Sequence, residues 1–170
     1  MSWWLLLKTV LFLMVVPTNV STTIPFLILH SFKKLALPHL WGFYAVLGGP
    51  LVLFGILTFV FSALTFAQAG RGTPIPWDAP KDFVAVGLYR FVRNPMYLGV
   101  LSVVLGWALI FCAPILLGYL FTLWLFFHLF ILIYEEPTLR RRFGDSYREY
   151  CRGVPRWIPR ETPARRRPKP

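Results

Sequence analysis

Two clusters of charged and aromatic residues flank one long uncharged stretch of the sequence. The first lies at 87–99, reads GLYRFVRNPMYLG and contains Arg93. The second is the adjacent pair Glu135 and Glu136, followed directly by Pro137. A guanidinium group binds carboxylates, and a carboxylate accepts hydrogen bonds from ammonium groups and sugar hydroxyls. The two clusters therefore have the chemistry to bind a zwitterionic small molecule, provided that the fold brings them together.

The elements that must position these clusters are predicted to be membrane-spanning helices. Of the 170 residues, 56% are hydrophobic, and three windows contain no charged residue: Thr9–Phe32, Leu35–Gly70 and Asn94–Tyr134. A bilayer core of about 30 Å needs about 20 helical residues. The first two windows fit one span each. The third has 41 residues, about twice the number that one span needs. We expect a break near Pro114, because proline is tolerated at a helix start and costly inside a helix.

The predicted fold class is an all-α integral membrane protein with about four transmembrane helices in one domain over residues 1–160. The spans are expected at about 3–29, 41–67, 95–112 and 114–135. Beyond Pro137, apolar and aromatic residues recur every three or four positions with arginines between them, and they are Leu139, Phe143, Tyr147, Tyr150 and Val154. This pattern predicts a C-terminal amphipathic interfacial helix at about 138–151. The basic, proline-rich residues 161–170 are predicted to form a disordered tail.

The placement of the positive charge predicts the orientation in the membrane. The formal net charge is +11, and with four spans only Lys33 and Lys34 of the 18 Lys and Arg residues lie on the side opposite the two termini. This bias predicts that both termini and the site face the cytoplasm. The basic excess would then face anionic lipid headgroups, which disfavours nucleic acid as a partner.

The last two spans should form a hairpin that brings the two charged clusters together. Asn94 and Pro95 are typical of a helix N-cap and first helical residue, and the free N–H groups of such a helix end bind anions. Consecutive helical residues point about 100° apart. One of Glu135 and Glu136 can therefore face a cavity while the other pairs with an arginine such as Arg93. The alternative is a glutamate pair that only ends the span.

Other polar and small residues in the apolar windows favour packing roles. The glycines of the second window predict close helix contact, and they are Gly42, Gly48, Gly49 and Gly55. The polar patch Thr18–Thr23 is expected either to pack between helices or to line a substrate cavity. His128 is expected to be a hydrogen-bonded packing residue. Cys112 and Cys151 lack metal-ligand spacing, so we expect two free thiols in apolar surroundings and no metal site.

The chain resembles the isoprenylcysteine carboxyl methyltransferase family, within the broader group that includes the phospholipid methyltransferases. The resemblance rests on 87–99, on YEEPTLRRRFGDSYREY at 134–150 and on VPRWIP at 154–159. It implies S-adenosylmethionine in a cytoplasmic-side pocket covered by the C-terminal helix, with a lipophilic substrate entering from the bilayer. The cofactor-binding residues that it implies are Gly87, Leu88, Tyr89, Arg93, Asn94, Pro95, Tyr97, Glu135 and Glu136.

Within this resemblance, the catalytic residues are Arg93, Glu135 and Glu136. Arg93 would orient a carboxylate, and a glutamate would hold the cofactor. The eukaryotic enzymes have a histidine at the position of Asn94. The asparagine amide can donate and accept hydrogen bonds, but it cannot take up or release a proton and carries no charge. Any role that needs an imidazole is therefore lost.

The expected function is S-adenosylmethionine-dependent methyl transfer to a lipophilic acceptor, in first place to a carboxylate. Transfer from a sulfonium to a carboxylate neutralises opposite charges, so a water-poor site favours the transition state. The alternatives are N- or S-methylation of a lipid amine or small thiol, with a glutamate as base. A sterol-reductase-like nicotinamide enzyme and a non-catalytic membrane scaffold or transport subunit are further alternatives.

Overall fold

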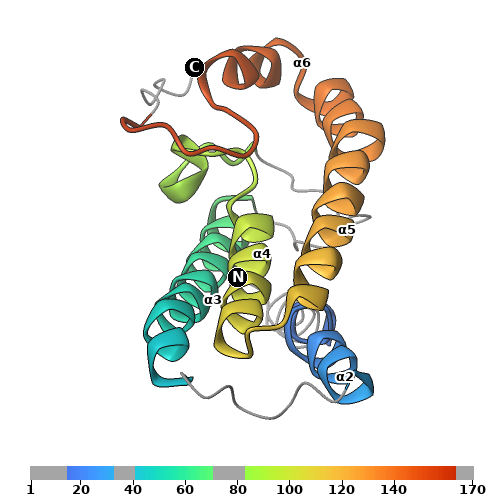
Figure 1. The fold of residues 1–170 in the computed structure, drawn as a ribbon. Helices are drawn as coiled ribbons and strands as arrows, with labels where there is room; N and C mark the ends of the chain where they lie inside the picture. The colour runs from blue at the N-terminus through green and yellow to red at the C-terminus, as the bar shows by residue number, and fades with distance from the viewer. Residues whose placement is uncertain (1–14, 33–40, 71–82, 164–170) are drawn as a thin grey trace.

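The structure, a computed structural model, describes residues 15–32, 41–70 and 83–163, and these residues form helices and loops without a strand. In chain order they form a helix from residue 15 through α2 (Ile24–Ser31), then α3 (Trp41–Gly70), α4 (Pro95–Ile110), α5 (Pro114–Phe130) and α6 (Glu136–Gly153). Figure 1 shows α3, α4 and α5 running along the length of the molecule, with α6 at one end. The all-α class predicted from the sequence is confirmed for these residues.

A π turn at Asn19–Thr23 precedes α2, in which Pro25 occupies the first turn. In a π turn each N–H bonds the carbonyl five residues earlier, so Pro25, which lacks an N–H, leaves the carbonyl of Val20 without its helical donor. The Tyr119 hydroxyl of α5 donates to this carbonyl at 2.7 Å. Of the polar patch, Ser21 is buried, whereas Thr18, Asn19, Thr22 and Thr23 are exposed. The patch therefore contributes one buried residue and one backbone acceptor to helix packing.

Helices α3 and α4 pack at two facing pairs of glycines. A Cβ on Gly48 would lie 2.6 Å from the Gly106 oxygen, and a Cβ on Gly55 would lie 2.6 Å from the Gly99 oxygen. Both pairs are seven residues apart on their helices, so they lie on one face of each helix. The close approach expected for Gly48 and Gly55 is confirmed. Gly42 and Gly49, by contrast, would meet nothing within 4 Å.

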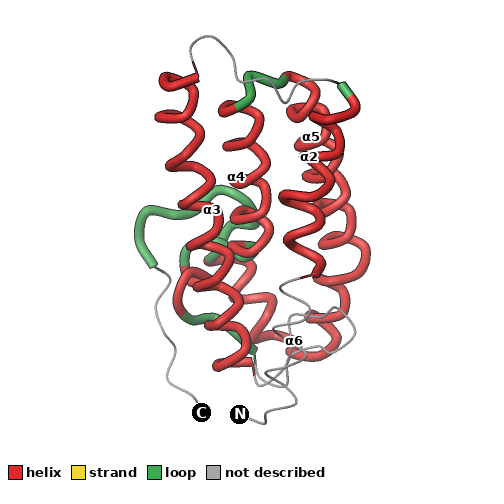
Figure 2. Tube along the Cα trace, turned by 90° about the horizontal axis from the view of Figure 1, so that it is seen from below, coloured by secondary structure: helices red, strands yellow, loops and turns green. Residues whose placement is uncertain are grey.

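The break expected near Pro114 is present. Helix α4 ends at Ile110, Cys112 has a positive φ of 46°, and Pro114 occupies the first turn of α5. This sharp turn directs α5 back along α4, and both Figure 1 and Figure 2 show the resulting hairpin. A buried cluster of Leu29, Ala108, Ala113 and Leu116 joins α2 to the turn.

Helix α5 continues into α6 through a second π turn, Ile131–Glu135. The sequence predicted a span that ends near residue 135 and a separate helix beyond Pro137, but the helix is continuous across Pro137. Pro137 follows this π turn at the same distance at which Pro25 follows the first, and the wider turn accommodates the missing N–H. The direction changes instead at Gly144, where φ is 53° and ψ is −126°. Beyond it, residues 145–153 cross the end of the molecule (Figure 1).

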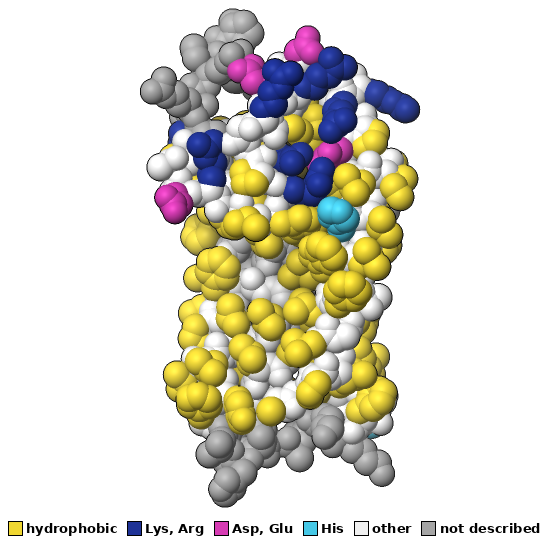
Figure 3. Space-filling model, turned by 45° about the horizontal axis from the view of Figure 1, so that its top comes forward, with side chains coloured by type: hydrophobic (Ala, Val, Ile, Leu, Met, Phe, Trp, Pro, Cys, Tyr) yellow, Lys and Arg dark blue, Asp and Glu magenta, His cyan; other side chains and the backbone are white. Residues whose placement is uncertain are grey.

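Two stretches within the described residues are long and apolar enough to cross a membrane, Gly42–Gly70 and the continuous helix from Pro114 onward. Helix α4 has 16 residues, which is about 24 Å of helix and less than a bilayer core of about 30 Å. On the face that Figure 3 shows, hydrophobic side chains cover the body of the molecule, and the arginine side chains of the described residues gather at the end formed by α6. This distribution is typical of a protein with its body in lipid. Residues 3–14 of the first expected span and residues 164–170 of the expected tail lie outside the described residues.

Candidate functional site

The segment before α4 is held in place by the segment after α6. The backbone N–H of Arg93 donates to the Pro155 carbonyl at 2.9 Å, and the N–H of Arg160 donates to the Phe91 carbonyl at 3.0 Å. The Tyr150 hydroxyl of α6 donates to the Tyr89 carbonyl at 2.7 Å. Residues about 60 positions apart in sequence therefore fix the backbone from which Tyr89 and Arg93 project.

Glu136 lies at the centre of an arginine cluster. Its Oε1 accepts hydrogen bonds from Arg93 Nη1 and Arg156 Nε, both at 2.8 Å, and its Oε2 accepts one from Arg140 Nη2 at 3.3 Å. Glu136 is 3% exposed. A carboxylate is tolerated at this depth because it is paired on both oxygens. The hydrogen bond to Glu136 in turn raises the pKa of the Arg156 guanidinium.

Glu135 points in another direction, as the angle between neighbouring helical residues predicts. Its Oε2 accepts a hydrogen bond from the Tyr97 hydroxyl at 3.0 Å. The Tyr97 ring stacks on Phe127 of α5, with ring centroids 4.5 Å apart. Within the described part of the chain no cation pairs with Glu135, in contrast to its neighbour Glu136.

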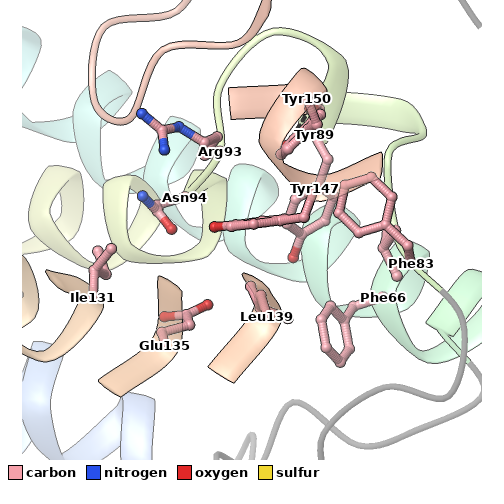
Figure 4. A pocket seen from close by; sticks show the side chains of 11 residues that line it. Phe66, Phe83, Tyr89, Arg93, Asn94, Ile131, Glu135, Leu139, Tyr147 and Tyr150 are labelled. Carbon is pink, nitrogen blue, oxygen red and sulfur yellow. Dashed lines mark hydrogen bonds between the residues drawn. The ribbon is translucent and has the colours of Figure 1, made fainter. Parts of the chain in front are cut away.

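A pocket opens between the charged cluster and a group of aromatic rings. Arg93, Asn94 and Glu135 line one end of it, Phe66 and Phe83 lie toward the other, and Tyr147 lies between them (Figure 4). The remaining lining residues are Val84, Tyr89, Ile131, Leu139 and Tyr150. The Phe83 ring meets the Tyr147 and Tyr150 rings edge to face, with centroids 5.8 and 5.0 Å apart. The pocket thus offers one cation, one anion and an aromatic wall.

Arg93 has donor capacity that the protein leaves unused. Its Nη1 is bound to Glu136 and also donates to Cys151 Sγ at 3.2 Å, but its buried Nε has no hydrogen-bond partner among the described residues. An unpaired buried donor costs about 1–3 kcal/mol, so an acceptor supplied by a ligand would be favoured there. The contact with Cys151 also corrects the expectation of apolar surroundings for that thiol.

Asn94 occupies the N-cap position of α4, as predicted, but its side chain does not cap the helix. Its Nδ2 instead donates to the Arg156 carbonyl at 3.1 Å. Asn94 is 7% exposed and lines the pocket. One N–H of the amide is therefore used by the C-terminal segment.

The structure brings together most, but not all, of the residues predicted for the site. Tyr89, Arg93, Asn94 and Glu135 line the pocket, while Tyr97 and Glu136 contact its lining through hydrogen bonds. Gly87, Leu88 and Pro95 do not line it. Gly87 begins a short 3-10 turn with a φ of 59°, close to Thr65, and Pro95 is the buried first residue of α4. These three shape the backbone rather than face the pocket.

Several residues of the site were not identified by sequence reasoning. Tyr147 and Tyr150 were assigned to the apolar face of an interfacial helix, yet they line the pocket. Arg156 was one arginine of a basic segment, and Trp157 had no role, although its Nε1 donates to His128 Nδ1 at 3.0 Å. The hydrogen bond of His128 confirms a packing role for that residue.

Burial raises the pKa of the Tyr89 hydroxyl well above its usual range, so Tyr89 serves as a neutral group.

The described residues contain no group of His, Cys, Asp and Glu side chains that could hold a metal ion. An apolar helical body with a charged, aromatic-lined pocket at one end is typical of a membrane protein. Comparison with known proteins adds the family. The phospholipid methyltransferase family model matches residues 43–146, which include Arg93, Glu135 and Glu136.

Curated relatives agree with this match. Proteins named probable protein-S-isoprenylcysteine O-methyltransferase from Oryza sativa subsp. indica and subsp. japonica are each 31% identical to this chain over 137 residues, which is 76% of this chain and 70% of theirs. The protein-S-isoprenylcysteine O-methyltransferase of Schizosaccharomyces pombe is 38% identical over 84 residues, 46% of this chain and 34% of that protein. No solved structure matches the chain. The chain belongs to the phospholipid methyltransferase family, and it is a membrane methyltransferase.

Proposed function

We propose that this methyltransferase uses S-adenosylmethionine and methylates a carboxylate on a lipophilic acceptor, of the prenylated-cysteine class named for its relatives. The observation that carries the proposal is the joint position of Arg93 and Glu135 in one aromatic-lined pocket at the end of an apolar hairpin. A carboxylate and a cation can be bound there side by side.

The residues of the pocket fit the cofactor. Arg93 offers a buried Nε donor that has no hydrogen-bond partner among the described residues, which suits a carboxylate. Glu135 is paired only with the Tyr97 hydroxyl among the described residues, which leaves acceptor capacity for an ammonium group or ribose hydroxyls. The rings of Phe66, Phe83 and Tyr147 suit an adenine ring and a sulfonium, because aromatic faces attract cations.

When bound, S-adenosylmethionine would supply a methyl group on a positively charged sulfur. The residues of this chain hold and orient the two reactants. Positioning donor and acceptor in line contributes several kcal/mol without any acid or base, since a carboxylate acceptor has no proton to lose. The aromatic wall and α6 exclude water, and a low-dielectric site favours a reaction that neutralises two charges.

Arg93 can serve a carboxylate from either of two sources, the amino-acid part of the cofactor or the acceptor. Binding and kinetic constants of the Arg93→Ala variant distinguish the two assignments. Loss of the cofactor contact in Arg93→Ala weakens S-adenosylhomocysteine binding, whereas loss of the acceptor contact raises the acceptor KM and leaves that binding unchanged.

We also propose a multi-pass topology of four spans, with both termini and the site on the cytoplasmic side. The arginine side chains at the α6 end support this orientation, because cytoplasmic segments carry the positive excess (Figure 3). Arg141, an exposed arginine of α6, would meet anionic headgroups and contribute about 1 kcal/mol.

The acceptor class is tested with labelled S-adenosylmethionine and full-length protein in nanodiscs. A prenylated cysteine with a free carboxylate should acquire base-labile label, as a methyl ester does. The same compound as its carboxamide is the matched control and should acquire none. Label on an aminophospholipid instead of the prenylated cysteine would assign N-methylation and contradict the carboxylate proposal.

A further inference from the structure

The segment after α6, Val154–Arg160, here called the C-terminal strap, crosses the charged end of the molecule and contacts the site at several points. We infer that Arg156 of this strap is a positioning residue: through Glu136 it holds the Arg93 guanidinium in the orientation that binds the ligand. The inference rests on the proposed function, because it assigns Arg93 to a bound carboxylate. It adds the strap to the functional site.

The first support is that two guanidinium groups share one oxygen atom. Arg93 Nη1 and Arg156 Nε both lie 2.8 Å from Glu136 Oε1. Glu136 is almost fully buried, and the Arg93 and Arg156 side chains are 13% and 25% exposed. Because the carboxylate is held between the two groups, removal of Arg156 frees Glu136 to rotate, and Arg93 rotates with it.

The second support is that the strap also fixes the backbone of the pocket. Its Pro155 carbonyl accepts the Arg93 N–H at 2.9 Å, and its Arg156 carbonyl accepts Asn94 Nδ2 at 3.1 Å. At its far side, Trp157 is tied to His128 of α5. Two pocket-lining residues, Arg93 and Asn94, thus take their positions from the strap.

The third support is the charge of the cluster. Three guanidinium groups, those of Arg93, Arg140 and Arg156, surround the single carboxylate of Glu136. The cluster therefore carries excess positive charge, and the buried Arg93 Nε has no hydrogen-bond partner within the described part of the chain. A ligand carboxylate would offset the excess positive charge and accept a hydrogen bond from Arg93 Nε. By linkage, a ligand that favours the docked strap must also be bound more tightly when the strap is docked.

The first test compares Arg156→Ala with Arg93→Ala in full-length protein in nanodiscs, measuring both the S-adenosylhomocysteine Kd and the acceptor KM. We expect Arg156→Ala to change the same one of these two constants as Arg93→Ala, by about tenfold. The double variant should change it no further than Arg93→Ala alone. Arg156→Lys should recover part of the loss, and Arg152→Ala, which removes an exposed arginine of α6, should behave as wild type.

Additive effects of Arg93→Ala and Arg156→Ala, or wild-type constants in Arg156→Ala, would overturn the positioning role. Failure of the proposed function has a different signature, since wild-type protein would then bind no S-adenosylhomocysteine at all.

A second test needs no variant, so it does not depend on the fold surviving a substitution. Hydrogen exchange of the wild-type amides is measured with and without S-adenosylhomocysteine. The Arg93 and Arg160 amides, which join the strap to the segment before α4, should exchange severalfold more slowly with the ligand bound. Ligand binding without slower exchange at these two amides would contradict the coupling.

Discussion

Glu135 and Glu136 are neighbours in the chain but lie in different surroundings. Glu136 is buried among three arginines, whereas Glu135 lines the pocket and is held by the Tyr97 hydroxyl. The π turn that ends at Glu135 sets these directions, and it is present because Pro137 cannot donate a helical hydrogen bond. One residue is thus available to a ligand, and the other organises the protein around it.

The two glutamates should therefore fail differently when substituted. Glu136→Ala leaves Arg93 and Arg156 without their shared partner, and we expect a loss of about 3–5 kcal/mol in the free energy of unfolding. Glu135→Ala should leave this free energy within about 1 kcal/mol of wild type, because only one hydrogen bond to a neutral donor is lost. Denaturant unfolding in detergent, followed by tryptophan fluorescence, measures both. Equal losses for the two variants would contradict the division of roles.

Tyr97 should act through Glu135 alone. Tyr97→Phe keeps the stacking on Phe127 but removes the hydroxyl group that donates a hydrogen bond to Glu135. We expect S-adenosylhomocysteine affinity to fall less than tenfold, which corresponds to the roughly 0.5–1.5 kcal/mol of one hydrogen bond. Calorimetric titration checks this value. A complete loss of binding would mean that the hydroxyl itself contacts the ligand.

The glycine contacts between α3 and α4 predict a sharp contrast within one helix. Gly55→Ala places a methyl group 2.6 Å from the Gly99 oxygen, so the two helices must separate, at a cost of about 1–3 kcal/mol. Gly49→Ala on the same helix meets nothing within 4 Å and should be neutral or stabilising by up to about 1 kcal/mol, because alanine favours helix. Thermal unfolding of the two variants in one detergent tests this. Equal midpoints would show that the helices are not in close contact.

The kink of α6 depends on the backbone of Gly144. A Cβ there would meet nothing within 4 Å, so Gly144→Ala is not a steric clash with neighbours. Its φ of 53° with ψ of −126° is a conformation that only glycine adopts without strain, and alanine should cost about 1–3 kcal/mol. Gly153→Ala, which is also free of contacts, is the control. If α6 tolerates both substitutions equally, then the kink is not fixed at residue 144.

The sequence was sufficient to predict what depends on local chemistry. The turn before Pro114, the position of Asn94 at the helix start and the close approach at Gly48 and Gly55 all follow from what proline, asparagine and glycine permit. The contact between Arg93 and the glutamate pair was predicted from the helical hairpin, because the two ends of a hairpin lie close together.

The parts of the site that could not be predicted depend on contacts between segments far apart in the sequence. The spacing of Tyr147 and Tyr150 indicated a helix face but not which surface covers that face, and they cover the pocket. Nothing local to Arg156 distinguishes it from the other arginines near the C-terminus. Its role depends on a segment that returns to pair with residues 91–94, about 60 positions earlier in the chain. The amide of Asn94 was likewise expected at its own helix end and is used by this segment instead.

The most direct test of the account is calorimetric titration of S-adenosylhomocysteine into detergent-purified protein, with Glu135→Gln and Glu161→Gln alongside. Glu161 is an exposed glutamate outside the site and serves as the matched control. We predict micromolar binding by wild type and by Glu161→Gln, and binding at least tenfold weaker by Glu135→Gln. The contradicting result is folded wild-type protein that binds no S-adenosylhomocysteine, or a Glu135→Gln variant that binds it as tightly as wild type.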